Sequence, residues 1–405
     1  MNRALHGWVV VLGAFTLMCV GFGLVYTFAA FFKAFEAEFA ASRAHIALVF
    51  SLCALLYFTL GAPAGMLADR YGPRRVAVAG VLCMAAGLAA ASQAHSLGAI
   101  YLFYSIGLGL GVGLTYVPSV GAVQPWFAAN RAFATGIAVS GIGAGNILFP
   151  PLAAWWIEAF GWRAAYQGLA LLALVVAGAA ALAIDNDPDK RALEQSGAAR
   201  EVLPGRTLRE AMRTFEFRLL YVTLIAGAGC TFIPMVHLGP YAIDAGYSDA
   251  AAVSLVSLIG LGSMLGRFFV GGVADRLGRM PTLAGTYAGL GCMFLVWWVT
   301  REYWLLAAFG LAFGVFYGGF VALFPTIVMD LFGPRQVSGI IGTLYTAAGI
   351  GTLAGPTLAG AAYDATGSYG VPILVGAGAE FLAAVGVVAL VLRMGTRSPA
   401  RKATY

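Results

Sequence analysis

The sequence predicts an all-α membrane protein in which twelve transmembrane helices form two pseudo-symmetric six-helix bundles. The first observation is composition: of 405 residues, 60% are hydrophobic and only 10% are charged, whereas a soluble domain carries about 25% charged residues. The second is a repeat. Gly65–Gly72 reads GMLADRYG and Gly271–Gly278 reads GGVADRLG, about half the chain length apart, and each copy interrupts an apolar stretch. The chain is therefore expected to contain two copies of one membrane unit.

The hydrophobic segments are each about 20 residues or longer, the length that a helix needs to cross roughly 30 Å of hydrocarbon. No small-residue cleavage site followed by a soluble domain comes after the first segment, so we expect it to be an uncleaved span. The expected spans are residues 7–32, 45–68, 76–93, 98–123, 132–156, 163–184, 218–241, 250–274, 282–299, 303–329, 337–361 and 371–393.

The distribution of positive charge predicts the orientation in the membrane. The formal net charge is +6, with 24 Lys and Arg residues. Most of these lie on the side of the predicted spans that carries both ends of the chain, which is the bias of cytoplasmic loops. We therefore expect both termini in the cytoplasm, a multi-pass protein of the inner (plasma) membrane, and no nucleic-acid partner.

The longest polar stretch joins the two halves and contains a helix-start signal. Thr207 and Glu210 have the spacing of a capping box, in which the two side chains satisfy each other's backbone donors. We expect a short amphipathic surface helix from Thr207 to about Phe217; a plain flexible linker is the alternative. The expected domains are 1–184 for the first bundle, 185–217 for the cytoplasmic linker, and 218–405 for the second bundle with its short cytoplasmic tail.

Nothing in the sequence indicates a cofactor or a metal. The five cysteines lack metal-ligand spacing. Glycine runs such as Gly107–Gly113 come without the strand that a dinucleotide-binding motif requires. Small residues that let membrane helices approach closely explain these runs better. No GxxxxGK[ST] loop for ATP is present.

The repeated motif places an acid beside an arginine where a span leaves the membrane, at Asp69 and Arg70 and again at Asp275 and Arg276. Arginines that pair across the halves could latch one conformation of the protein. The simpler alternative is that these charges only anchor the topology.

The motif, present in both halves of a twelve-span chain, resembles the major facilitator superfamily. His6-Gly7-Trp8, the stretch Pro125–Gly145 (PWFAANRAFATGIAVSGIGAG) and His237–Ala242 (HLGPYA) are similar to the monocarboxylate transporter family, which includes bacterial lactate and oxalate/formate carriers. The resemblance covers nearly the whole chain. It implies the superfamily's fold and the carriage of small carboxylates, by many members with a proton and by some in exchange.

Two charged residues lie well inside the predicted spans, Arg267 and Glu380. Such residues are costly in a membrane and mark functional sites. The Arg267 guanidinium offers a planar fork that matches a carboxylate, and the resemblance implies that an arginine at this position binds the substrate; snorkelling to the interface is the alternative. We expect Glu380 to be a protonated or helix-paired residue rather than a substrate contact.

His237 and Asp244 lie at the outer end of the seventh span, seven residues apart and near one helix face. Histidine can change charge near neutral pH. This pair is our candidate for proton coupling and gating, with a structural histidine beside a solvated acid as the alternative.

Other amphipathic residues are candidates for contact with the substrate, each of which could equally serve helix packing. They are Tyr26, Tyr116, Asn146, Tyr317, Phe320 and Tyr345.

The chain departs from the animal members of the family in two places. Tyr26 stands where those members have an intramembrane lysine, and Ser263 stands where they have an acid. Their lysine-and-acid proton relay is therefore absent. Span eleven carries no second membrane cation, which favours a monoanion over a dianion.

The sequence thus predicts a secondary active transporter of a small, lactate-like monocarboxylate that works by alternating access, with Arg267 holding the anion and with proton symport as the energy source. Carboxylate exchange or organic-acid export is the alternative within transport, and a non-transporting sensor is a remote one. We expect no enzyme activity. The expected partners are the carboxylate, protons and the lipid bilayer, and the expected state is a monomer.

Overall fold

The computed structural model describes residues 3–123, 126–127, 131–185, 204–333 and 335–396, and the described chain is helical almost throughout. The helices of the first half are α1 (Arg3–Tyr26), α2 (Phe28–Phe39), α3 (Arg43–Thr59), α4 (Gly61–Tyr71), α5 (Pro73–Ala91), α6 (Leu97–Ile100), η1 (Tyr101–Ile106), α7 (Gly107–Val123), α8 (Arg131–Leu172), η3 (Ala173–Ala177) and α9 (Gly178–Ala183). Those of the second half are α11 (Leu208–Met212), α12 (Phe215–Asp244), α13 (Asp249–Leu277), α14 (Arg279–Val299), α15 (Tyr303–Phe332), α16 (Val337–Thr366) and α17 (Gly370–Thr396).

Within this described part, 9 helices are long and apolar enough to cross a membrane, or 10 if the bent pair formed by α3 and α4 is one span. One of them, Phe133–Ala183, is 51 residues long and breaks at Gly161, whose φ is +79°, so it crosses twice. Adding α16, which has 30 residues but is not one of those candidates, gives twelve long helical passages in the described residues, the number that the sequence predicts.

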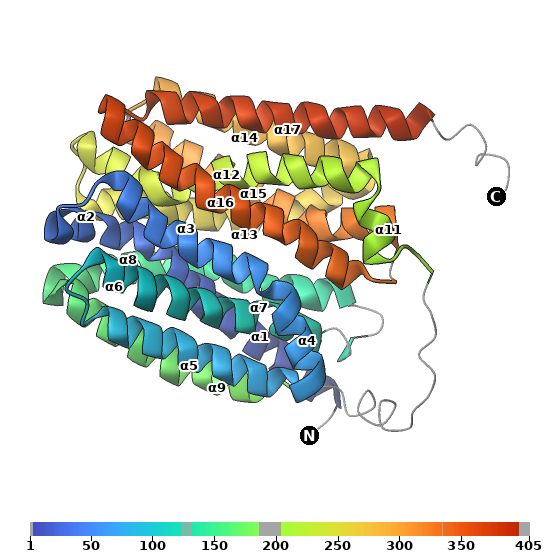
Figure 1. Ribbon diagram of the computed structural model, residues 1–405, viewed down its shortest axis with the longest axis horizontal. Helices are drawn as coiled ribbons and strands as arrows, with labels where there is room; N and C mark the ends of the chain where they lie inside the picture. The colour runs from blue at the N-terminus through green and yellow to red at the C-terminus, as the bar shows by residue number, and fades with distance from the viewer. Residues whose placement is uncertain (1–2, 124–125, 128–130, 186–203, 334, 397–405) are drawn as a thin grey trace.

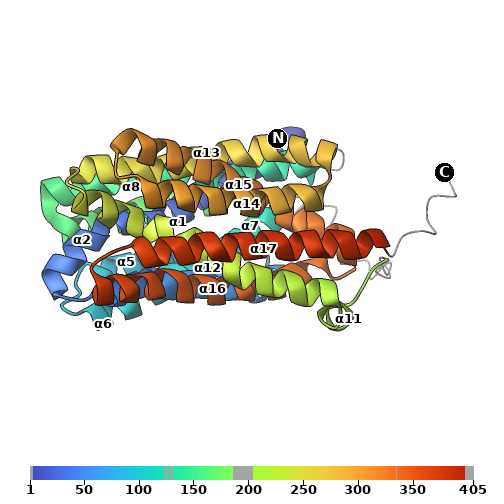
Figure 2. The ribbon, with the colours of Figure 1, turned by 90° about the horizontal axis from the view of Figure 1, so that it is seen from above.

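The two halves lie side by side with their long helices roughly parallel (Figure 1, Figure 2). In the first half α1 packs on α8 and α5 on α7, and in the second α13 packs on α15 and α14 on α17. The most extensive contacts between the halves are α3 with α16 and α8 with α13, and α2 with α12 adds another. The start of α1 and the end of α17 lie at the same end of the molecule as α11 (Figure 1). We call this the α11 end and the opposite one the Arg43 end.

Glycine allows several of these close helix crossings. A Cβ at Gly355 of α16 would collide with the carbonyl oxygen of Gly229 in α12, and one at Gly141 of α8 would collide with that of Phe15 in α1. The backbones of the paired helices are therefore in direct contact at these glycines, which have no side chain beyond a hydrogen atom. Close contact through small residues is typical of membrane helices. The predicted packing role of the glycine runs is confirmed at these positions.

The capping box is confirmed, but its helix is shorter than predicted. The Thr207 side chain accepts from the Glu210 backbone N–H, and the Glu210 carboxylate accepts from the Thr207 backbone N–H at 2.8 Å. This backbone donor holds the pKa of Glu210 below its ordinary value. The helix ends at Met212, because Thr214 caps a new helix, α12. Most of the predicted linker, residues 186–203, lies outside the described residues.

Candidate functional site

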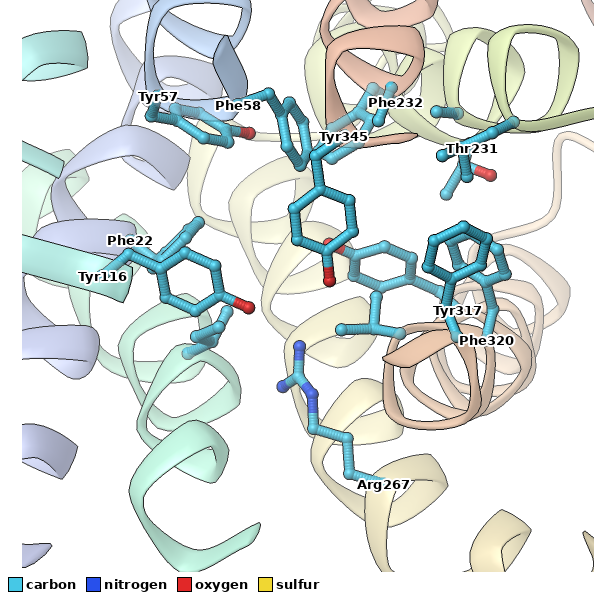
Figure 3. A pocket seen from close by; sticks show the side chains of 16 residues that line it. Phe22, Tyr57, Phe58, Tyr116, Thr231, Phe232, Arg267, Tyr317, Phe320 and Tyr345 are labelled. Carbon is cyan, nitrogen blue, oxygen red and sulfur yellow. The ribbon is translucent and has the colours of Figure 1, made fainter. Parts of the chain in front are cut away.

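A cavity of about 50 Å³ lies between the two halves and is lined by helices of both. This volume is large enough to hold water. Sixteen side chains line the cavity: Phe22, Tyr57, Phe58, Tyr116, Ile142, Leu224, Ala228, Thr231, Phe232, Arg267, Tyr317, Phe320, Val321, Phe324, Tyr345 and Ala348. Most are aromatic or aliphatic, and both halves contribute to the wall (Figure 3).

Arg267 is the one charged residue among these lining residues. Its guanidinium extends from α13 into the centre of the cavity, toward the hydroxyl groups of Tyr116 and Tyr345 (Figure 3). All three guanidinium nitrogens are buried, and none has a hydrogen-bond partner. A buried donor group of this kind is costly when left unpaired, and an anion in the cavity would satisfy it.

Hydroxyl groups supply the remaining polarity. The Tyr26 and Tyr317 hydroxyls are 3.2 Å apart, and the Tyr57 hydroxyl has no partner. Thr231 donates away from the cavity, to Oε1 of the buried Glu380 at 2.9 Å. An anion held by the arginine could therefore find further donors among the tyrosines.

The structure places five of the seven predicted substrate-binding residues in the cavity wall. These are Arg267, Tyr116, Tyr317, Phe320 and Tyr345. The other two lie behind it. Tyr26 reaches the wall through its hydrogen bond to Tyr317, and Asn146 is packed against Gly260 where α8 meets α13.

Sequence reasoning missed most of the apolar wall, including Phe22, Phe58, Phe232 and Phe324, and also Thr231. The spans that carry these residues are apolar on every face, so no periodic polar stripe marks the side that faces the cavity. Thr231 and Glu380 lie 149 positions apart, and their contact could not be read from spacing.

Polar contacts between the halves gather at the Arg43 end. Arg43, which is 5% exposed, donates from Nη1 to Asp244 Oδ2 at 2.6 Å and from Nη2 to Oδ1 at 2.8 Å. It also donates to the Tyr369 hydroxyl at 2.9 Å and to Glu36 at 3.0 Å. Lys33 bridges Glu36 and Asp244 at 2.7 and 3.2 Å. These five residues, three from the first half and two from the second, are called here the Arg43 cluster.

A second connection beside this cluster uses a helix terminus. The Asp364 carboxylate accepts the backbone N–H groups of Arg43 and Ala44, both at 2.9 Å. These are the first residues of α3, where unpaired N–H groups and the helix dipole favour an anion. Thus the end of α16 caps α3 across the boundary between the halves.

His237 connects to the cluster in a defined direction. Its Nε2 lies 2.8 Å from the Pro356 carbonyl, which only accepts, so Nε2 carries the proton. Because Arg43 donates to the Tyr369 oxygen, the Tyr369 hydroxyl donates in turn to His237 Nδ1 at 3.0 Å. The neutral imidazole is fully satisfied by this chain of hydrogen bonds.

His237 and Asp244 therefore belong to one network but are not direct partners, since Tyr369 and Arg43 lie between them. α12 continues through Pro240 to Asp244. The sequence spacing of His237 and Asp244 predicts a direct pair and gives no sign of the residues between them. Arg43, the residue that joins them, carried no signal in the sequence beyond its place in an outer loop.

The four predicted latch residues lie at the α11 end. Arg70 is exposed and its guanidinium lies 5.2 Å from the Tyr71 ring, and Asp275 and Arg276 are exposed. The Asp69 side chain is outside the described part. No ion pair joins the three described side chains to the opposite half in this state, so the latch stays a prediction.

An ion pair does form near the second copy of the motif. Arg279 Nη1 lies 2.6 Å from Asp330 Oδ1, and both residues belong to the second half. In the described ranges, no group of three or more His, Cys, Asp or Glu residues could hold a metal ion.

Comparison with known proteins agrees with this architecture. The model of the Major Facilitator Superfamily matches residues 11–303. Monocarboxylate transporter 13 of Bos taurus is 29% identical over 388 residues, which cover 94% of this chain and 88% of the relative. Monocarboxylate transporter 11 of Mus musculus is 32% identical over 391 residues (91% and 84%), and monocarboxylate transporter 12-B of Danio rerio is 30% identical over 400 residues (90% and 82%). The chain belongs to the major facilitator superfamily and, within it, to the monocarboxylate transporters, and is therefore a multi-pass membrane transporter of that type.

Proposed function

We propose that this protein is a secondary active transporter that carries a small monocarboxylate across the inner membrane by alternating access, together with a proton. The observation that supports this most strongly is the buried Arg267 guanidinium, whose three nitrogens lack partners in a cavity between the halves. A carboxylate satisfies two of these nitrogens at once with parallel hydrogen bonds.

The lining of the cavity favours a monoanion with an apolar body. With one cation in the wall, a second carboxylate on the substrate would enter a low-dielectric site without a partner, at a high desolvation cost. The aromatic rings offer flat apolar surface to the remainder of the molecule. Lactate-like aliphatic acids and small aromatic acids fit this description.

The Arg43 cluster and His237 are proposed to form the gate on the outer side. Breaking the bidentate Arg43–Asp244 pair separates the halves at this end, while the acid–arginine motifs at the α11 end are proposed to pair in the opposite, outward-open state. Substrate changes the balance between the two states only through different affinity for each.

The expected orientation places the α11 end and both termini in the cytoplasm, which agrees with the bias of Lys and Arg. The transporter is proposed to act as a monomer. We assign gating to His237 and Asp244 because the closed gate contains a neutral histidine and a carboxylate paired with Arg43 and Lys33. Proton binding by either residue would weaken this arrangement, so the pair is also proposed to couple opening of the gate to the proton.

Uptake of radiolabelled L-lactate into proteoliposomes, with pyruvate and benzoate as competitors, tests the proposal. An inward proton gradient should stimulate uptake, and Arg267→Ala should abolish it, while Ala at the exposed Arg301 should not. Uptake that ignores the gradient but requires internal carboxylate would establish exchange instead. If no tested acid is carried or competes, the proposed substrate class is wrong.

A further inference from the structure

Glu380 is a buried carboxyl group that the transport scheme above does not use. It lies in α17 and is 0% exposed. Its Oε1 accepts a hydrogen bond from Thr231 Oγ1 at 2.9 Å, whereas its Oε2 is buried without any partner. A carboxylate with only one donor is poorly satisfied in a membrane interior, and a neutral carboxylic acid is the less costly form there.

The groups around Glu380 provide no compensating charge. Cys230 on α12 and Tyr287 on α14 are the titratable side chains that interact with it. α16, the other helix packed on α17, presents no charged or titratable group to it, and no ion pair to Glu380 exists in the described residues. Its charge is therefore set by proton binding rather than by a neighbouring cation.

Thr231 connects this carboxyl group to the transport site. Its side chain is part of the cavity wall that also contains Arg267, and its hydroxyl bonds to Glu380 (Figure 3). A hydroxyl can both donate and accept, so a proton can pass between cavity water and Glu380 through this one residue. The route crosses from α12 to α17 entirely inside the second half.

The charges of Arg267, Glu380 and a bound anion together explain why proton binding to Glu380 would accompany anion binding. The described contacts join Glu380 to Thr231 and not to Arg267, so with the cavity empty an ionised Glu380 offsets Arg267 only in the net charge of the carrier. A carboxylate anion that enters pairs with Arg267, which leaves an ionised Glu380 as the uncompensated charge in a low-dielectric region, at a high cost. Binding of one proton to Glu380 restores neutrality, so anion and proton are favoured together.

We propose that the Glu380 carboxyl group binds the proton that accompanies the substrate, one per anion, and that Thr231 relays this proton between the cavity and Oε1. This inference rests on the proposed transport of a carboxylate with a proton. Only O–H bonds change: the Thr231 hydroxyl gives its proton to Glu380 Oε1 and takes another from cavity water, and the proton drawn from water on one side of the membrane is returned to water on the other.

The wild-type protein should then move substrate without net charge. Uptake should respond to a proton gradient, reaching tenfold accumulation per pH unit when one proton is coupled, and a membrane potential imposed with potassium and valinomycin should leave it unchanged. A trapped pH indicator should report one proton entering per anion. Wild-type uptake driven by the potential would overturn the proposal without any variant.

Glu380→Gln supplies the permanently neutral form. It should retain counterflow, in which the loaded carrier exchanges labelled for unlabelled substrate and never returns empty. It should lose accumulation driven by the proton gradient and gain sensitivity to membrane potential, because the empty carrier now returns with the unbalanced charge of Arg267. Glu158→Gln, which removes an exposed carboxylate, is the matched control and should behave as wild type.

Substitutions at Thr231 test the relay separately. Thr231→Val removes the donor to the carboxylate, which favours the protonated acid, and should move the pH midpoint of proton-driven uptake upward by about one unit. Thr231→Ser should restore the wild-type midpoint. An unchanged midpoint in the valine variant would remove Thr231 from the route.

The outcomes separate this inference from the proposed function. If the wild-type protein carries no carboxylate in counterflow or uptake, the proposed function itself fails. If wild type and Glu380→Gln both accumulate substrate to the same extent with a proton gradient, transport stands and Glu380 is not the proton site. Loss of gradient-driven accumulation with counterflow intact supports the assignment. If Glu380→Gln does not fold, the wild-type charge measurement and the Thr231 midpoint decide.

Discussion

Asp244→Asn is expected to open the Arg43 end of the protein. The substitution keeps the shape of the side chain but removes the charge that receives two hydrogen bonds from Arg43, at 2.6 and 2.8 Å. A hydrogen bond to a charged group contributes roughly 1.5–3 kcal/mol. The lower part of this range applies, because the Asp244 side chain is 31% exposed and water can replace part of the interaction. We therefore expect the closed state to lose about 2 kcal/mol, or roughly 30-fold in the ratio of closed to open protein.

The assay measures how fast a buried cysteine becomes accessible. Gly239 lies in α12 against α2, and a Cβ there would meet only the Ala29 carbonyl oxygen, at 3.6 Å, so Gly239→Cys fits the closed state. In a background without the five native cysteines, a membrane-impermeant maleimide should label this position about 30-fold faster when Asp244→Asn is added, since labelling follows the open fraction.

Glu38→Gln is the matched control for this experiment. Glu38 pairs with Arg163 at 2.9 Å, but both residues belong to the first half, so the loss of this pair should not separate the halves. Equal labelling rates in the Asp244→Asn variant and its parent would refute the view that the Arg43 cluster holds the gate closed. Acceleration by the Glu38 variant as well would point to general loosening instead.

Two further predictions concern packing and the linker helix. Gly355→Ala should lower the melting temperature, because its Cβ would collide with the Gly229 carbonyl oxygen and overpacking typically costs about 1–3 kcal/mol. Gly285→Ala, whose Cβ would have nothing within 4 Å, should leave the melting temperature unchanged. Equal melting temperatures for the two variants would contradict the backbone contact. The capping box should weaken in acid: the pKa of Glu210 is lowered by the Thr207 backbone donor, so its stabilising effect is present above the ordinary carboxyl pKa and is lost as the pH falls through the lowered value. Amide-exchange protection in α11, corrected for intrinsic rates, should fall accordingly, and protection that is constant with pH would refute this.

The sequence was sufficient for features that leave a local signal. The repeated motif and the apolar segment lengths predict the twelve passages, and an arginine inside a span predicts a place for Arg267 in the candidate site, whose cavity it lines. The capping box at Thr207 could be recognised because its two residues are three positions apart, although the new helix start at Thr214 was missed.

Features that depend on distant pairs of residues could not be predicted. Arg43 and Asp244 are 201 positions apart, and each looks like an ordinary loop or helix-end charge by itself. The cavity wall was hidden for a different reason, since Phe58 or Phe232 on a wholly apolar helix can face lipid, a neighbouring helix or the cavity with equal plausibility. Only the three-dimensional arrangement distinguishes these cases.

Equilibrium binding to the purified protein tests the central claim most directly, namely that the unpaired Arg267 guanidinium holds the carboxylate of the substrate. Binding of radiolabelled L-lactate and benzoate should be compared with that of their uncharged amides, in wild type and in Arg267→Gln. We predict that wild type binds the acids and not the amides, and that the variant loses this preference. Pairing a buried guanidinium with a carboxylate, compared with leaving it unpaired, changes the affinity by several-fold to a hundredfold. Equal preference for the acid in both proteins would contradict the claim and place the anion elsewhere.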